Sequence, residues 1–366
     1  MKTKTLPLFI LLLFSFYLFP GCNNKQKPAI GKEDEIIVIA DSTLYYQIEP
    51  EMLHVFEKII YTPQPENLFN LKRENLKNLN KLKNRKNIII IGTLDSDDAV
   101  SEYIKASLDS SVTKLVKERK NFFFNKNDLW AKHQLVMFLT ANSIDELKQN
   151  ILNANEELLY SFRQTSNKRL FAKLYKPGLE MKKIKARLLK SYGWTFYIQP
   201  GTELAINDSL NNFVWLRSGR NTPIERWIFV HWINNANPDY LNKDSVTTIR
   251  NRITKKYFTV AEDSAYVEIA TEMSKPKVSQ ATFNDGYSLM TQGFWKFSDK
   301  SGGGPFINYS FLDENTGRFY MVDASIFAPK YYKKKLIQQA DVILNSFKTK
   351  DKLSKKRIEE ILSELD

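Results

Sequence analysis

Cysteine is almost absent from this sequence: Cys22 is the sole cysteine among 366 residues. Without a second thiol the chain has no disulfide framework, no zinc-type cysteine cluster and no cysteine nucleophile after position 22. Histidine is scarce as well, with only three in the chain, and neither a Gly-x-Ser-x-Gly elbow nor a His-Glu-x-x-His pair occurs. We therefore predict no metal site and no cofactor, and we expect each histidine to be a packed or hydrogen-bonded residue.

The position of the lone cysteine is informative. Two lysines, Lys2 and Lys4, precede an unbroken apolar run over residues 6–19, and Pro20 and Gly21 then precede Cys22. This order is typical of a secretory signal peptide, and the run is too short to span a hydrocarbon core of roughly 30 Å comfortably. Residues 18–22 resemble a bacterial lipobox, although Phe19 and Pro20 depart from its commonest pattern. We expect cleavage after residue 21 and lipid on Cys22; an ordinary signal peptide with an incidental cysteine is the alternative.

The charge and the export signal together limit the partners. The formal net charge is +13, which in a cytosolic protein would suggest nucleic acid. An exported, lipid-anchored protein meets little nucleic acid, so anionic lipid, an anionic polymer or another envelope protein is the expected partner besides the membrane itself. Asn23, rather than aspartate, follows the cysteine, which favours the outer membrane and a periplasm-facing position. Residues 22–34 form a lipidated N-terminus and a tether whose polar part reaches roughly 30 Å.

Apolar periodicity predicts an α+β fold. Residues 35–41 and 87–92 are β-branched runs typical of strands buried on both faces, and each is followed by residues at helical spacing. A hairpin is expected from 122–124 and 134–140, and Ser143 with Glu146 forms a capping box. Aromatic residues make up 13% of the chain, which excludes a disordered protein.

Lys176-Pro-Gly178 interrupts this pattern and suggests a boundary between two mixed sheet-and-helix modules, residues 35–177 and 178–347. Each module ends in a strand followed by a helix, with Leu-Leu-Tyr-Ser-Phe162 in one and Ile-Leu-Asn-Ser-Phe347 in the other. These endings favour a pseudo-repeat of one unit. Residues 348–366 form a charged helical tail, either solvated or docked on a partner.

One segment combines basic and aromatic residues in the manner of a ligand site. Arginine forks and indole rings together can hold an anionic or glycan ligand, and a glycine-rich run later in the chain is a second candidate loop. The candidate ligand-binding residues are Trp215, Arg217, Arg220, Arg226, Trp227, Trp232, Gly302, Gly303 and Gly304. The alternative is that the aromatic strand builds a core and that the glycines only connect strands. Alternation places Arg226 and Trp232 on one face of that strand and Trp227 on the other.

Carboxylate pairs offer a different kind of site. General acid–base chemistry of the glycosidase type requires two carboxyl groups held several ångströms apart. Glu203, Glu225, Asp285 and Asp323 are candidates by chemistry alone, and no spacing brings two of them together.

The arrangement resembles an uncharacterised lipoprotein family of Bacteroidota that carries a domain-of-unknown-function label. The similar segments are 35–41, 63–65, 85–91, 302–309 and 328–330, and the resemblance covers about residues 35–347. It implies a cell-envelope setting and supports the lipobox, but it assigns no catalytic residue. We expect a lipid-anchored binding or assembly component at the outer membrane, and the alternative is a hydrolase of envelope glycans or lipids.

Overall fold

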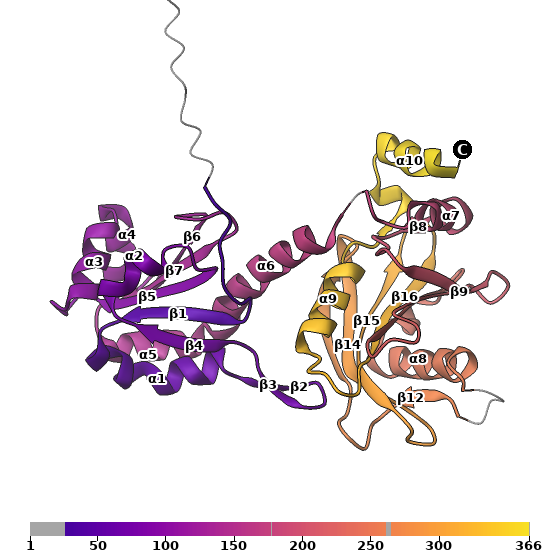
Figure 1. The fold of residues 1–366 in the computed structure, drawn as a ribbon, viewed down its shortest axis with the longest axis horizontal. Coiled ribbons are helices and arrows are strands. Elements are labelled where there is room, and N and C mark those ends of the chain that lie inside the picture. Colours follow the sequence, from indigo (N-terminus) through magenta and orange to yellow (C-terminus); the bar gives the residue numbers. More distant parts are fainter. Residues whose placement is uncertain (1–25, 177, 261–264, 366) are drawn as a thin grey trace, which may run out of the picture.

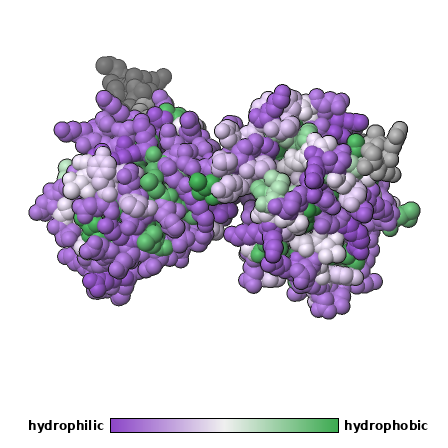
Figure 2. Space-filling view, turned by 90° about the horizontal axis from the view of Figure 1, so that it is seen from below, coloured by the Kyte–Doolittle hydropathy of each residue, from purple (hydrophilic) through white to green (hydrophobic). Residues whose placement is uncertain are grey.

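The computed structural model describes residues 26–176, 178–260 and 265–365, so the expected signal peptide and Cys22 lie outside the described residues. Two modules stand side by side, joined by a long helix that runs from the first module towards the second (Figure 1). Viewed from below, they form two lobes that meet at a narrower waist, and the visible surface is largely hydrophilic (Figure 2). The expected α+β class with two modules is confirmed.

The first module is a mainly parallel five-stranded sheet in the order β4-β1-β5-β7-β6, with only β6 antiparallel. Its elements are β1 (Glu35–Ala40), α1 (Ser42–Phe56), β2 (Ile59–Tyr61), β3 (Pro65–Asn67), β4 (Asn70–Glu74), α2 (Leu79–Leu82), β5 (Asn87–Thr93), α3 (Ala99–Ser107), α4 (Ser110–Lys117), β6 (Phe123–Asn127), β7 (Leu135–Ala141), α5 (Ile144–Asn153) and α6 (Asn155–Leu174).

Both faces of this sheet are covered, as its continuous apolar strands predict. On β1, Ile36 and Val38 pack under α1, α5 and α6, whereas Ile37 and Ile39 pack under α2 and α3. Helix α1 does not begin at Pro50, although proline suits the first turn of a helix. It begins at Ser42, because Asp41 accepts hydrogen bonds from the backbone N–H groups of the first turn, and Pro50 lies inside it.

The second module is an antiparallel sheet in the order β12-β14-β15-β16-β11-β10-β9, with β13 also paired to β14. Its elements are α7 (Lys182–Tyr192), β8 (Trp194–Thr195), β9 (Thr202–Asp208), β10 (Phe213–Ser218), β11 (Glu225–Ile233), α8 (Lys243–Tyr257), β12 (Val267–Ile269), β13 (Lys277–Phe283), β14 (Gly286–Phe297), β15 (Gly303–Asp313), β16 (Arg318–Phe327), α9 (Lys334–Leu344), β17 (Lys348–Thr349) and α10 (Lys355–Leu362).

Helices α7 and α9 cover one face of this sheet and α8 covers the other, so alternate residues of each strand enter two separate cores. The expected pseudo-repeat is wrong, because one sheet is mainly parallel and the other antiparallel. The charged tail docks on the second module of its own chain. Ile361 of α10 packs on Ala186 and Leu189 of α7, and Lys182 pairs with Glu364 at 2.7 Å.

The first described residues run along the edge of the first module. The backbone N–H of Ala29 donates to the carbonyl of Lys132 at 2.9 Å, and the N–H of Lys132 donates to the carbonyl of Lys27 at 2.9 Å. The backbone N–H of Ile30 likewise donates to the carbonyl of Asn84, and the backbone N–H of Lys86 donates to the carbonyl of Ile30. Half of the expected tether is therefore part of the folded module. In the described part of the chain, no helix is long and apolar enough to cross a membrane.

Candidate functional site

The predicted aromatic and basic residues of β10 and β11 are packed into the second module. Trp215 and Trp227 lie in the core under α8, where their rings meet edge to face with centroids 6.2 Å apart and both contact Phe258. Trp232 lies in the opposite core, beside Trp194. The predicted alternation of faces along β11 is therefore confirmed.

The three predicted arginines have separate environments. Arg217 donates from Nε and Nη2 to Oε2 of Glu225 at 2.9 and 2.7 Å, and the indole of Trp227 donates to the same oxygen. Arg220 is exposed and lies 3.8 Å from Glu203. Arg226 points to the other face, where Nη2 donates to Gln339 at 2.7 Å and burial lowers its pKa. The structure does not gather these arginines around one pocket.

Gly302 directly precedes β15, and Gly303 and Gly304 are its first two residues. A Cβ atom at Gly303 would collide with the carbonyl oxygen of Trp295, and one at Gly304 with that of Ile326. Glycine is required at both positions because neighbouring backbone approaches so closely. These residues line no cavity, and ligand binding by the predicted cluster stays a prediction.

The candidate carboxylates are dispersed and ion-paired. Asp323 is fully buried and accepts from Nε of Arg250 at 2.7 Å, while Glu225 is bound to Arg217 and Asp285 to Lys348. On the paired strands β11 and β16, Glu225 lies opposite Phe327, and Asp323 lies opposite Phe229. Glu225 and Asp323 are therefore offset by four residues along the strands, which is roughly 13 Å. No hydrogen bond or ion pair of the described residues joins two of these four carboxylates.

The histidines and other metal-ligand side chains of the described residues form no group of three that could hold a metal ion. His231 is buried in β11, and its Nδ1 lies 2.9 Å from the carbonyl oxygen of Asn212. Burial lowers the pKa of His231 to about 4, so the ring is neutral near pH 7.

A large hollow lies elsewhere, between the two modules. This interdomain cleft has a volume of about 750 Å³. Its floor is the α9-side face of β14 and β15, where Gln292 pairs with Ile307 and Phe294 with Pro305. Helix α9, helix α6, the β2–β3 hairpin and the segment before β13 supply its walls. Ligand pockets in proteins commonly measure about 300–1,000 Å³ and lie at domain interfaces.

The cleft is mostly apolar, and among the described residues its lining holds more unpaired cations than unpaired acids, which are Glu156 and Asp341. Glu33 is paired with Arg169 and Lys86, and Asp34 with Lys334. Among the described residues, four further cations that line the cleft make no ion pair, namely Lys58, Arg163, Lys275 and Lys277. Apolar side chains separate them, including Ile60, Leu159, Met273, Phe294, Ile307 and Ile337.

Asp341 of α9 is the acid most affected by its place in this cleft. Its Oδ1 accepts hydrogen bonds from the hydroxyl of Tyr309 at 2.7 Å and from Nδ2 of Asn345 at 2.8 Å. Burial raises the pKa of Asp341, and the charge of Arg163 and the two hydrogen bonds oppose that shift only in part. The carboxyl group of Asp341 therefore takes up a proton at a higher pH than an ordinary aspartate does.

The modules are held around the cleft by the β2–β3 hairpin. Helix α9 has no side-chain cap of its own, and Oε1 of Glu66 accepts from the backbone N–H groups of Lys333 and Lys334 at 3.0 and 2.9 Å. In return Nζ of Lys334 donates to Asp34 and to the carbonyl of Asn67. The first module thus positions the helix that forms one wall of the cleft.

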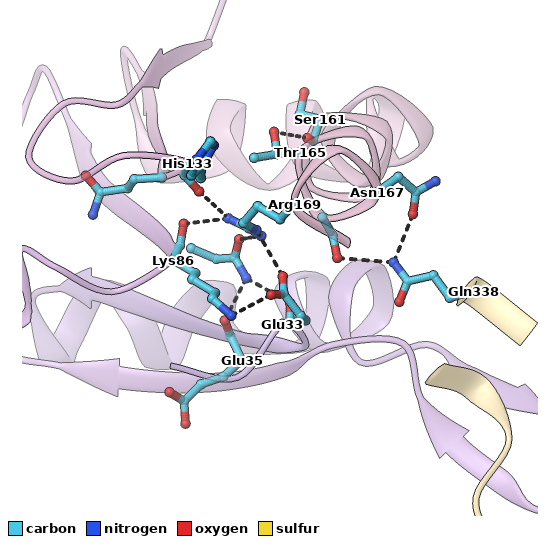
Figure 3. Close-up of polar contacts among 12 residues, drawn as sticks. Glu33, Glu35, Lys86, His133, Ser161, Thr165, Asn167, Arg169 and Gln338 are labelled. Carbon is cyan, nitrogen blue, oxygen red and sulfur yellow. Dashed lines mark hydrogen bonds and ion pairs between the residues drawn. The ribbon is translucent and has the colours of Figure 1, made fainter. Parts of the chain in front are cut away.

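Helix α6 forms the second connection, as Figure 3 shows. The guanidinium of Arg169, 8% exposed, donates to Glu33, to Asn87 and to the carbonyls of Lys86 and His133. These partners lie at or beside the beginnings of β1, β5 and β7, so α6 is fixed to the sheet. Gln338 of α9 then donates to Ser166 and Asn167 on the same helix at 3.1 and 2.9 Å.

The sequence interpretation missed the cleft because its floor and walls come from segments that lie far apart in the sequence. Pro63 and Pro65 gave no sign of a contact between modules, yet they lie at the turn of the hairpin that reaches the second module. The other sequence feature that could have pointed to the cleft is Lys275-Pro-Lys277 with the exposed Met273 before it, a basic and apolar segment ahead of a strand.

Two family models match the chain, and both are described as a domain of unknown function. DUF8532 matches residues 29–175 and DUF4837 matches residues 180–346. The matches change from one to the other where the chain leaves α6 and enters α7. The expected resemblance to an uncharacterised domain-of-unknown-function family is confirmed. No curated protein matches the chain.

Proposed function

We propose that this chain, which carries two domains of unknown function in series, is a lipid-anchored binding protein of the cell envelope. Its ligand would occupy the interdomain cleft. The observation that carries this proposal is the cleft itself, about 750 Å³ in volume and closed by elements of both modules. The predicted Trp215 to Trp232 segment offers no comparable space.

The lining of the cleft favours an anionic ligand with an apolar part. Lys58, Arg163, Lys275 and Lys277 supply positive charge that no acid of the described residues neutralises by an ion pair. The apolar floor formed by Phe294 and Ile307 would bind a hydrocarbon segment by removing it from water. A fatty acid, or a lipid with an acid group, has both properties.

The envelope setting rests on the N-terminal sequence. Cys22 ends an apolar segment of signal-peptide length, and Asn23 follows it. We propose the outer membrane of a Bacteroidota cell, with the modules facing the periplasm. Two or more acyl chains on Cys22 would provide stable anchoring, where one chain alone is marginal.

A titration tests the cleft. The probe is decanesulfonate, which stays ionised across the usable pH range, with decanol as its uncharged counterpart. Isothermal titration should show decanesulfonate binding more tightly than decanol. Arg163→Gln with Lys277→Gln should weaken binding about tenfold for each cation removed, since a charge-assisted contact contributes on the order of 1.5 kcal/mol or more. The matched control, Lys190→Gln with Lys243→Gln, removes two exposed lysines outside the cleft. Equal affinity of the wild type and both double variants for decanesulfonate would contradict an anionic ligand in the cleft.

Membrane fractionation tests the anchor separately. In the native host, the wild-type chain should incorporate labelled fatty acid and sediment with membranes, whereas Cys22→Ala should do neither. A Cys22→Ala protein that still carries label would contradict the anchor and leave the cleft proposal intact. The contacts of Glu225, Asp285 and Asp323 favour no hydrolase, so we do not propose one.

A further inference from the structure

We propose that one edge of the first module lies directly on the surface of anionic phospholipid. This anchor-side face consists of Lys27, Ile30, Lys83, Leu129, Trp130 and Lys132. It takes its location from the proposed lipid anchor, but its binding to lipid is a separate property.

The path of the chain places this face next to the anchor. In Figure 1 the first described residues descend along the β6 side of the first module. They are fixed there by the pairing of Pro28 with Lys132 and of Ile30 with Arg85, and by the bond from Gln26 Nε2 to the carbonyl of Asp128. Only five residue steps separate Cys22 from Lys27, at most roughly 17 Å of extended chain. A lipid on Cys22 would therefore hold this edge of the module close to the headgroups.

The charge of the face complements an anionic surface. Lys27 and Lys132 are exposed and pair with no acid of the described residues, and the amine of Lys83 lies 5.7 Å from the centroid of the Trp130 ring. Asp128, the acid in the same loop as Leu129 and Trp130, accepts a hydrogen bond through Oδ1 from the backbone N–H of Gln134. Each lysine near an anionic leaflet contributes about one kcal/mol of attraction.

Apolar side chains accompany these cations. Ile30 is 51% exposed and Leu129 is 37% exposed, and the half-buried Trp130 follows Leu129 in the sequence. Tryptophan beside lysine is typical of the membrane–water interface, where the ring sits at headgroup depth and the amine reaches the phosphate. Exposed aliphatic groups there leave water when the face meets the bilayer. A hydrophilic protein partner would not account for them.

Sedimentation with vesicles tests this inference without the lipid anchor. The protein is the chain from position 22 onward with Cys22→Ser, which retains every described residue. It should bind vesicles of phosphatidylglycerol mixed with phosphatidylcholine and not vesicles of phosphatidylcholine alone. Lys27→Gln, Lys83→Gln and Lys132→Gln combined should weaken binding about 100-fold, with an unchanged circular dichroism spectrum.

A matched control separates the face from net charge. Lys190→Gln, Lys243→Gln and Lys355→Gln remove the same charge from exposed positions in the second module and should change binding less than threefold. Equal losses in both triple variants, or no loss in either, would overturn the proposal. If vesicles bind as expected but Cys22 takes up no labelled fatty acid, the proposed anchor is wrong and the lipid-binding face stands. If Cys22 is labelled but the protein without the anchor binds no vesicles, only the lipid-binding face is rejected.

Discussion

The carboxylate of Glu66 in the first module caps the helix that begins at Lys334 in the second, by a hydrogen bond of 2.9 Å to the backbone N–H of Lys334. Lys334 returns the contact through Nζ, which lies 2.9 Å from Oδ2 of Asp34. Although burial opposes it, the hydrogen bond and charge of Lys334 lower the pKa of Asp34. The two modules are therefore coupled through the start of the helix that forms one wall of the cleft.

Glu66→Ala should weaken this coupling. Loss of a cap costs about 1 kcal/mol of stability, and here the loss also removes a contact between modules. Small-angle scattering should show a larger radius of gyration, and thermal unfolding should separate into two transitions. Glu102→Ala, at an exposed position on α3, is the control and should change neither. An unchanged scattering curve for Glu66→Ala would contradict the coupling.

Arg169→Ala should destabilise the first module far more than a surface change. It leaves the carbonyls of Lys86 and His133 and the side chains of Glu33 and Asn87 without their shared donor. Breaking a buried charged network typically costs about 3–5 kcal/mol. Urea denaturation should measure this loss, and Lys168→Ala on the exposed side of α6 should cost well under 1 kcal/mol. Similar losses in the two variants would show that the network contributes little.

His231 predicts a pH dependence of stability. Its folded-state pKa is about 4, below the ordinary value of 6.5, because burial disfavours the charged ring. The unfolded chain therefore binds more protons between these values, and stability present above pH 6.5 is lost as the pH falls towards 4. The loss should approach 3 kcal/mol, at about 1.4 kcal/mol for each pKa unit. His231→Phe should flatten this part of the profile, and an unchanged slope would contradict the assignment.

Asp341 should make decanesulfonate binding depend on pH. Its raised pKa means that the carboxyl group loses its charge at a higher pH than an ordinary aspartate, and its charge repels an anion in the cleft. Affinity should rise as the pH falls through that raised pKa. Asp341→Asn should bind more tightly at neutral pH and lose the dependence. Titration at several pH values measures both effects, and a variant that keeps the wild-type profile would remove Asp341 from the site.

Much of the fold could be predicted from local patterns. Ile36 to Ile39 are all apolar because each face of β1 meets a helix layer, and alternation along β11 correctly separated Trp227 from Trp232. Strand β4, by contrast, could not be predicted from an apolar pattern. It lies at the edge of the sheet, where Asn70 and Lys72 face solvent and carry no apolar signal.

The cleft could not be predicted in this way. Glu66, Arg163 and Asp341 are far apart in sequence, and each is an unremarkable polar residue in its own segment. Only the packing of the hairpin and α6 against α9 brings them around one space. Conversely, Trp215 and Arg217 form an evident cluster in sequence, yet in the fold Trp215 packs against the core under α8 and Arg217 is paired with Glu225.

Hydrogen–deuterium exchange with and without decanesulfonate tests the central claim most directly, because it reports where the anion binds. A ligand held between the modules should slow exchange in the β2–β3 hairpin, residues 59–67, and in α9, residues 334–344, within the same titration. Exchange over residues 213–233 should stay unchanged. Protection confined to one module, or centred on residues 213–233, would contradict the interdomain cleft as the binding site.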